Sequence, residues 1–242
     1  MRIAVISDVH SNLHALQAVL AAVAKESADE IWCLGDVVGY GPRPSECCAL
    51  LRERASICLA GNHDLGVIGT IEVALFAGEA GAAVRWTRDA LSDDAHGFLS
   101  GLQPAGRADG VELYHASARN PVWEYVLGPE QALASFAVTE APVVLVGHSH
   151  FPLALRLDGT RVLGGSAPAG HEVDLAEGRW LLNPGSVGQP RDGDPRAAWL
   201  LLDTGSHSAS FRRVEYPVAL TQAEVRAAGL PEGLAARLAY GV

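Results

Sequence analysis

The chain has 242 residues, of which 18 are basic and 28 acidic, so its formal net charge is −10. Apolar residues make up 49% and charged residues 19%, which excludes a disordered chain and provides enough apolar surface for a full core. We expect one α/β domain over residues 1–242. The negative charge disfavours extended nucleic acids and anionic membrane surfaces as partners, because both attract basic surfaces.

Cysteine spacing and hydropathy bear on the compartment. Cys33, Cys47, Cys48 and Cys58 form no Cys-x-x-Cys pair, so we expect buried thiols in a reducing cytoplasm and no zinc knuckle. The N-terminus turns polar after only a few apolar residues, unlike a signal peptide, and no apolar run approaches the roughly 20 residues of a membrane-spanning helix. We therefore expect a cytoplasmic protein, and a homo-oligomer is compatible with the sequence.

Strand and helix patterns alternate in the first part of the chain. Arg2–Ser7, Glu30–Leu34 and Ser56–Ala60 are predicted strands, and Asn12–Lys25 and Ser45–Arg54 are predicted helices. This alternation is typical of a mostly parallel sheet with covered faces.

The middle and the end of the chain differ from this pattern. An Ala-rich segment over 70–102 predicts a helical excursion beside the sheet. Thr221–Gly229 is a predicted helix, with Thr221 as its N-cap and Glu224 completing a capping box. Short strands fill the remainder, antiparallel after Phe151, and they are Val111–His115, Val143–Gly147, Leu153–Leu157, Glu172–Leu175, Arg179–Leu182, Ala197–Asp203 and Ser208–Glu215.

Polar residues gather directly after five of the predicted strands. They are Asp8-Val9-His10, Gly35-Asp36, Gly61-Asn62-His63-Asp64, Tyr114-His115 and Gly147-His148-Ser149-His150. Because ligands bind at the carboxyl ends of strands in open α/β sheets, we expect these side chains to share one crevice. Carboxylates, imidazoles and an amide without thiolates suit Mn²⁺, Fe²⁺ or Zn²⁺, with Ni²⁺ also compatible, and exclude a calcium cage. The ligand number favours two divalent metal ions.

These blocks, in this order, resemble those of the calcineurin-like metallophosphoesterases, and most closely the small bacterial and archaeal phosphodiesterase branch. Asn183-Pro184-Gly185-Ser186 extends the resemblance into the second half, and Gly39-Tyr40-Gly41-Pro42 resembles one subgroup. The resemblance implies an α/β fold of two mixed sheets flanked by helices, with a dinuclear metal centre.

The resemblance also implies roles for individual residues. Asp8, His10 and His150 would hold the first metal, Asp36 would bridge both, and Asn62, His115 and His148 would hold the second. His63 would lie near the phosphate as a catalytic residue without binding metal, and Asp64 would orient it. The block Tyr114-His115-Ala116-Ser117 departs from the His-Gly that relatives often have.

This arrangement predicts a phosphoesterase that hydrolyses small phosphate esters, above all phosphodiesters, by attack of a hydroxide bridging two metals. A phosphomonoesterase, a protein phosphatase and a dinucleoside polyphosphate hydrolase remain alternatives, as does a non-catalytic protein-binding scaffold of the same fold. His63 and the complete ligand set favour an enzyme over the scaffold. A metallo-β-lactamase is excluded because Phe151-Pro152 follows His148-Ser149-His150.

Two arginines are candidate substrate-binding residues. The guanidinium of Arg191 would clamp a phosphate, with a solvated surface turn as the alternative. Arg119 and Trp123 follow the His115 loop and would shape a pocket, with loop packing as the alternative. Asn12 is the predicted N-cap of the first helix.

Overall fold

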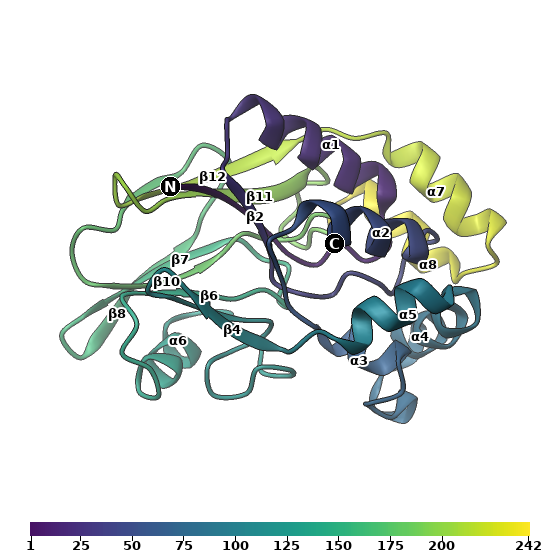
Figure 1. Cartoon of the computed structure of the whole chain (residues 1–242), viewed down its shortest axis with the longest axis horizontal. Helices are drawn as coiled ribbons and strands as arrows, with labels where there is room; N and C mark the ends of the chain where they lie inside the picture. Colours follow the sequence, from purple (N-terminus) through teal and green to yellow (C-terminus); the bar gives the residue numbers. More distant parts are fainter.

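Two six-stranded mixed sheets form the frame of the molecule in the computed structural model, which describes residues 1–242 (Figure 1). The first sheet has the order β3-β2-β1-β11-β12-β9, with bounds Ile57–Cys58, Glu30–Cys33, Arg2–Ile6, Ala197–Asp203, Ser208–Val214 and Glu172–Asp174. The second has the order β4-β5-β6-β10-β7-β8, with bounds Ala105–Ala108, Val111–Tyr114, Val143–Leu145, Arg179–Asn183, Leu153–Asp158 and Arg161–Ser166. The predicted two-sheet α/β architecture is confirmed.

The directions of the strands determine at which edge of each sheet the following loops lie. β1, β2 and β3 are parallel, as their alternation with helices predicts, and β5, β6 and β10 are parallel in the second sheet. Parallel neighbours put their carboxyl ends at the same edge of a sheet. The prediction of purely antiparallel pairing after Phe151 is wrong for β10, because that strand inserts between β6 and β7 and pairs in parallel with β6.

Helices cover the outer faces of both sheets. Alternate residues of β1 point to opposite faces: Ile3 and Val5 pack between the sheets, and Ala4 and Ile6 pack under helices α1 (Leu13–Lys25) and α2 (Pro44–Arg54). On the far side, α6 (Pro129–Phe136) covers the second sheet. The frame is therefore a helix–sheet–sheet–helix stack.

The remaining helices gather at one end of this stack (Figure 1). The predicted excursion over 70–102 is confirmed as η1 (Val73–Leu75), α4 (Gly78–Ala90) and α5 (Asp93–Ser100), which follow the short α3 (Asn62–Val67). The chain ends in α7 (Val218–Ala227), α8 (Glu232–Ala236) and η2 (Arg237–Ala239). A separate apolar cluster joins α4 to the C-terminal helices through Ala83, Val225 and Leu234.

Some elements differ from the sequence prediction. The strands β4 and β8 and the helices α3 and α6 were not predicted, since each is short and weakly patterned; β8 contains Gly164 and Gly165 and is largely exposed. Thr221 does not cap a helix: α7 begins at Val218, and the Thr221 hydroxyl donates to Oδ1 of Asn12 at 3.1 Å. Asn12 caps α1 as predicted, because its Oδ1 accepts from Ala15 N.

No helix of the structure has the length and apolar character needed to cross a membrane.

Candidate metal centre and substrate cleft

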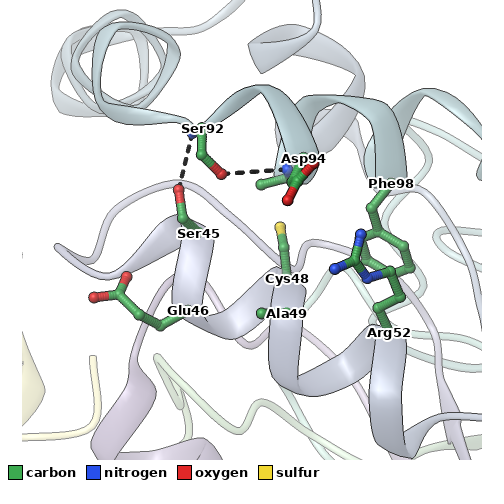
Figure 2. Close-up of a pocket in the computed structure, with 9 residues that line it drawn as sticks. Ser45, Glu46, Cys48, Ala49, Arg52, Ser92, Asp94 and Phe98 are labelled. Atoms are coloured by element: carbon green, nitrogen blue, oxygen red, sulfur yellow. Dashed lines mark hydrogen bonds between the residues drawn. The ribbon is translucent and has the colours of Figure 1, made fainter.

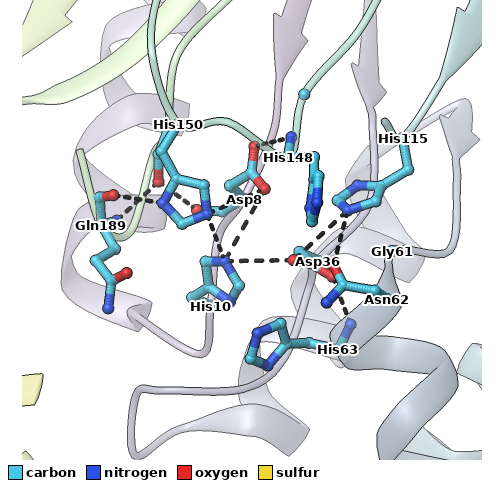
Figure 3. A network of polar contacts seen from close by, with 12 residues as sticks. Asp8, His10, Asp36, Gly61, Asn62, His63, His115, His148, His150 and Gln189 are labelled. Carbon is cyan, nitrogen blue, oxygen red and sulfur yellow. Dashed lines mark hydrogen bonds and ion pairs between the residues drawn. The ribbon is translucent and has the colours of Figure 1, made fainter. Parts of the chain in front are cut away.

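The polar residues predicted from the motifs meet in one place, on loops that follow the strands (Figure 3). Seven of the ten non-glycine residues with positive φ lie in these loops, and they are Asp8, His10, Ser11, Asp36, Tyr40, His148 and His150. Such backbone conformations cost about 1–3 kcal/mol each and persist only where the surroundings hold them. The concentration of strained residues marks this edge as the functional end of the sheets.

Four side chains form the first group of candidate metal ligands. The donor atoms of Asp8, His10, Asp36 and His150 all lie within 4.8 Å of one another, and all four side chains are buried. Nε2 of His150 lies 3.4 Å from Oδ1 of Asp8, and Nε2 of His10 lies 3.4 Å from Oδ2 of Asp36. This group contains the residues that the family resemblance implies for the first metal, together with the bridging Asp36.

Asp36 also belongs to a second group, with His115 and His148. Its Oδ2 lies 3.6 Å from Nε2 of His115, and Oδ1 of Asn62 lies 3.2 Å from the same nitrogen. The carboxylate therefore faces both groups at once, which is the position that a bridging ligand requires.

Backbone carbonyls fix the tautomers of three of these histidines. Nδ1 of His10 lies 3.1 Å from Val38 O, and Nδ1 of His150 lies 2.6 Å from Gln189 O. Nδ1 of His115 lies 2.9 Å from Leu34 O. A carbonyl can only accept, so each Nδ1 carries the proton and donates, and each Nε2 presents a lone pair to the cluster.

The donor set fits divalent metal ions. Oδ1 of Asp8 and Nε2 of His148 are buried without any hydrogen-bond partner. Burial raises the pKa of Asp8 to about 7 and lowers the pKa of His148 to about 2. Burial likewise raises the pKa of Asp36 well above the ordinary range of a carboxyl group. It lowers the pKa of His10 well below the ordinary range of an imidazole. Cations at this cluster would satisfy the unpartnered atoms and stabilise the carboxylates in their charged form.

Glycines allow the loops to approach this closely. A Cβ at Gly61 would collide with Oδ1 of Asp36, and a Cβ at Gly147 would collide with the Ser7 hydroxyl next to Oδ2 of Asp8. His148 N then donates to this Oδ2 at 3.1 Å. The loops after the strands are thus locked to one another through the candidate ligands.

His63 lies beside the cluster without belonging to either ligand group. Its backbone N–H donates to Oδ1 of Asp36 at 2.9 Å, and its ring packs edge-on to that of His10 with centroids 4.9 Å apart. Nδ1 of His63 has no hydrogen-bond partner, and burial lowers the pKa of the ring to about 3. The ring lines the cleft described below, where a substrate can reach it.

Asp64 contacts the backbone and not the His63 ring, so the expectation that it orients this imidazole is not met. Its Oδ2 accepts from Gly61 N at 2.9 Å and from Val37 N at 3.2 Å, and its Oδ1 accepts from Val38 N at 3.0 Å. Asp64 therefore ties the β2 loop to the start of α3, and it acts on the site through the positions of Asp36 and Asn62.

A cleft of about 380 Å³ opens onto the cluster. Aromatic rings form much of its lining: Phe76 packs against Trp123 with centroids 5.4 Å apart, and Tyr125 stacks on His148 at 4.1 Å. Tyr40 packs against His63 at 4.4 Å. Of the two alternatives for Trp123, the structure places it at the cleft.

The structure separates the two predicted substrate-binding arginines. Arg191 lines the cleft, and its guanidinium lies 5.9 Å from the centre of the Tyr40 ring. Arg119 does not line it: its side chain is 52% exposed and forms an ion pair with Glu124. Sequence reasoning missed Arg237, which lines the cleft from η2. No local motif marks Arg237, because only the tertiary path of the C-terminal segment brings it here.

A second hollow, of about 260 Å³, lies between α2 and α5 (Figure 2). Ser45 Oγ accepts from Ser92 N there, and Cys48 is buried in its floor. This hollow contains no histidine, and burial raises the pKa of the Cys48 thiol far above its ordinary range. Cys48 is thus a packed thiol, as expected, and the metal-competent residues belong to the other cleft.

The chain belongs to the calcineurin-like phosphoesterase superfamily, whose domain model matches residues 1–207. The uncharacterized protein MJ0912 of Methanocaldococcus jannaschii is 35% identical over 247 residues, covering 99% of this chain and 98% of that protein. A metallophosphoesterase structure from Sphaerobacter thermophilus is 43% identical with a TM-score of 0.91, covering 100% of this chain and 99% of that one. The hypothetical protein PH1004 of Pyrococcus horikoshii shares the fold, with a TM-score of 0.80 at 20% identity and coverage of 100% and 98%. The family resemblance drawn from the motifs is confirmed.

Proposed function

We propose that the protein is a phosphodiesterase that depends on two divalent metal ions and acts on small phosphate esters. The observation that carries this proposal is the position of Asp36, whose Oδ2 lies 3.4 Å from Nε2 of His10 and 3.6 Å from Nε2 of His115. One carboxylate shared by two ligand groups is the arrangement that holds two cations close together. Asp8, His10 and His150 would hold one ion, and Asn62, His115 and His148 would hold the other.

Ions bound there would lower the pKa of a coordinated water and neutralise charge on the phosphoryl oxygens. Imidazole, carboxylate and amide donors favour Mn²⁺, Fe²⁺ or Zn²⁺, and Ni²⁺ also fits. The backbone of the chain orients the candidate ligands: the carbonyls of Val38 and Gln189 fix the ring orientations of His10 and His150.

His63 and Arg191 act on the substrate. The His63 ring lines the cleft outside both ligand groups, so it is free to hold a proton toward the oxygen of the departing group. Arg191 carries a permanent charge, and its buried Nε has no hydrogen-bond partner in the protein. It would bind a non-bridging oxygen of the phosphate. Asp64 is a positioning residue in this scheme, since it contacts only backbone N–H groups.

The cleft favours a diester over a monoester. A diester carries two organic groups, and the rings of Phe76, Trp123 and Tyr125 offer apolar surface beside the cluster. The net charge of −10 favours small esters over extended nucleic acids. The four free cysteines fit a reducing cytoplasm.

Purified protein stripped of metal and reloaded with each ion would test this proposal. We expect hydrolysis of bis(p-nitrophenyl) phosphate to exceed hydrolysis of p-nitrophenyl phosphate, with two ions bound per chain. Asp36→Asn should bind fewer ions and lose turnover. Absence of metal-stimulated turnover on both esters in the wild type would favour the non-catalytic scaffold instead.

A further inference from the structure

Two guanidinium groups, those of Arg191 and Arg237, line the cleft without an Asp or Glu partner. Nε of Arg237 donates to Val242 O, and a terminal nitrogen of Arg191 donates to Oε1 of Gln189 at 2.9 Å. By contrast, Arg213 and Arg226 on neighbouring elements pair with Asp192 and Glu232. Half-buried cations that share a cleft repel one another, so their presence in one cleft favours an anion beside them.

Arg191 is the inner of the two groups. Its guanidinium lies 5.9 Å from the centre of the Tyr40 ring, and that ring packs against His10 at 4.6 Å and His63 at 4.4 Å. Its charge also contributes to the lowered pKa of His63. Arg191 therefore faces the phosphate that is hydrolysed.

Arg237 enters the same cleft from η2, at the end of the chain. Its side chain is half-buried, and burial together with the charge of Arg191 lowers its pKa. Within this cleft Arg237 is therefore a partly desolvated cation, and Glu79 acts on its pKa in the direction opposite to Arg191.

The position of Arg237 is built into the fold. Gly193 N donates to Gly241 O at 2.9 Å, and the Gly241 backbone packs against Asp194, so the C-terminus is fastened to the loop that carries Arg191. Just before η2, Leu234 of α8 packs in the apolar cluster shared with α4. Both ends of the short segment around Arg237 are therefore held, unlike those of a solvated surface arginine.

We propose that Arg237, beside Arg191, forms a second anion subsite, which binds a phosphate of the substrate other than the hydrolysed one that Arg191 faces. This inference rests on the proposed function and narrows its substrate class to nucleoside phosphate esters with an additional phosphate group. The nucleoside is favoured because Phe76 and Trp123 line the same cleft as a pair of aromatic rings, on which a base can stack.

A matched pair of chromogenic substrates tests the subsite: thymidine 5′-(p-nitrophenyl phosphate) and the same compound carrying a 3′-phosphate. We expect the wild type with Mn²⁺ to show a kcat/KM about tenfold or more higher on the second compound, the effect of one charge-assisted hydrogen bond. Arg237→Gln should lose this preference and keep its rate on the first compound, whereas Arg237→Lys should keep part of it. Arg226→Gln, an exposed arginine on α7, is the control that should change neither rate.

Equal wild-type rates on the two compounds, or an equal loss on both in Arg237→Gln, would overturn the subsite while leaving the phosphodiesterase intact. Titration calorimetry of the metal-free protein with pyrophosphate measures anion affinity and so tests the subsite without turnover. Binding that weakens about tenfold in Arg237→Gln but not in Arg226→Gln supports the subsite even if neither ester is hydrolysed. Unchanged pyrophosphate binding would contradict it.

Discussion

The Nε2 atoms of His10 and His150 face each other at 3.0 Å in the buried interior. Both rings donate Nδ1–H to a backbone carbonyl, that of Val38 and that of Gln189, so neither Nε2 carries a proton. Two lone pairs at this distance repel each other unless a cation accepts both. The pair is therefore preorganised for a metal, and the single carbonyl contact of each ring keeps it so.

Removal of metal should destabilise the protein for this reason. We expect the melting temperature to fall on chelation and to recover with Mn²⁺, because ion at 1,000 times its Kd adds about 4 kcal/mol. His10→Ala should shift less on chelation than the wild type, because it loses a ligand of one proposed ion while the group of Asp36, His115 and His148 stays complete. His14→Ala is the matched control, since His14 is a partly exposed residue of α1 that contacts Glu224, and it should respond like the wild type. Identical wild-type melting curves with and without chelator would contradict the metal centre.

His63 should separate catalysis from metal binding. His63→Ala is expected to lower kcat by about 10²–10⁴ on a diester with an alkyl leaving group, which needs a proton, and by less on a p-nitrophenyl ester. The metal content measured by elemental analysis should stay at the wild-type value, because the ring is outside both ligand groups. If His63→Ala loses metal in proportion to activity, the imidazole acts through the ions and not on the substrate.

The two predicted substrate arginines should behave differently. Arg191→Gln is expected to lower kcat/KM by about tenfold to a hundredfold, with or without a rise in KM, because the variant loses the proposed contact of the guanidinium with the phosphate. Arg119→Gln should leave both constants within about twofold, because exposed ion pairs such as Arg119–Glu124 contribute little. Steady-state kinetics on one diester checks both variants. Equal effects would mean that the Arg119 loop closes over the substrate.

The grouping of the candidate ligands was predictable because each of them follows a strand in the chain. A strand end is a local feature, and parallel strands carry neighbouring ends to one edge, so Asp8 after β1 and Asp36 after β2 could be placed together from pattern alone. The packing of histidines on carbonyls was not predictable. It depends on distant backbone groups such as Gln189 O, whose location only the folded loops determine.

Residues outside the motifs show which contacts could not be predicted from the sequence. Arg119 and Trp123 are four positions apart, yet only Trp123 lines the cleft. The carboxamide of Asn120 between them accepts from Trp123 N at 3.2 Å and turns the chain, and nothing in the residue types gives the direction of that turn. Asp64 was assigned to its sequence neighbour His63 when its partners are backbone groups of another loop, such as Val38 N. Sequence proximity was a poor guide to contact in both cases.

The buried carboxylate of Asp8 should make the stability of the metal-free protein depend on pH. Its folded-state pKa, about 7, lies above the ordinary value of 3.8, so the folded state binds the proton more tightly than the unfolded state. The stabilisation is complete below the ordinary pKa and is lost as pH rises through 7. Between pH 6 and pH 8.5 this group should remove about 1 kcal/mol of unfolding free energy.

Asp8→Asn should remove the contribution of Asp8 to this loss of unfolding free energy. The raised pKa of Asp36 leaves a further contribution of the same sign in the variant. Denaturant unfolding of the metal-free protein at both pH values measures the effect as the difference between the wild type and Asp8→Asn, because buried histidines with lowered pKa values, such as His10 and His148, contribute stability that rises with pH over the same interval in both proteins. Asp203→Asn is the control: the pKa of this surface carboxyl lies below its ordinary value because it accepts backbone N–H bonds, so the pH dependence should persist. An equal pH dependence in the wild type and in Asp8→Asn would mean that Asp8 is ionised and paired within the apoprotein, which its unpartnered Oδ1 argues against.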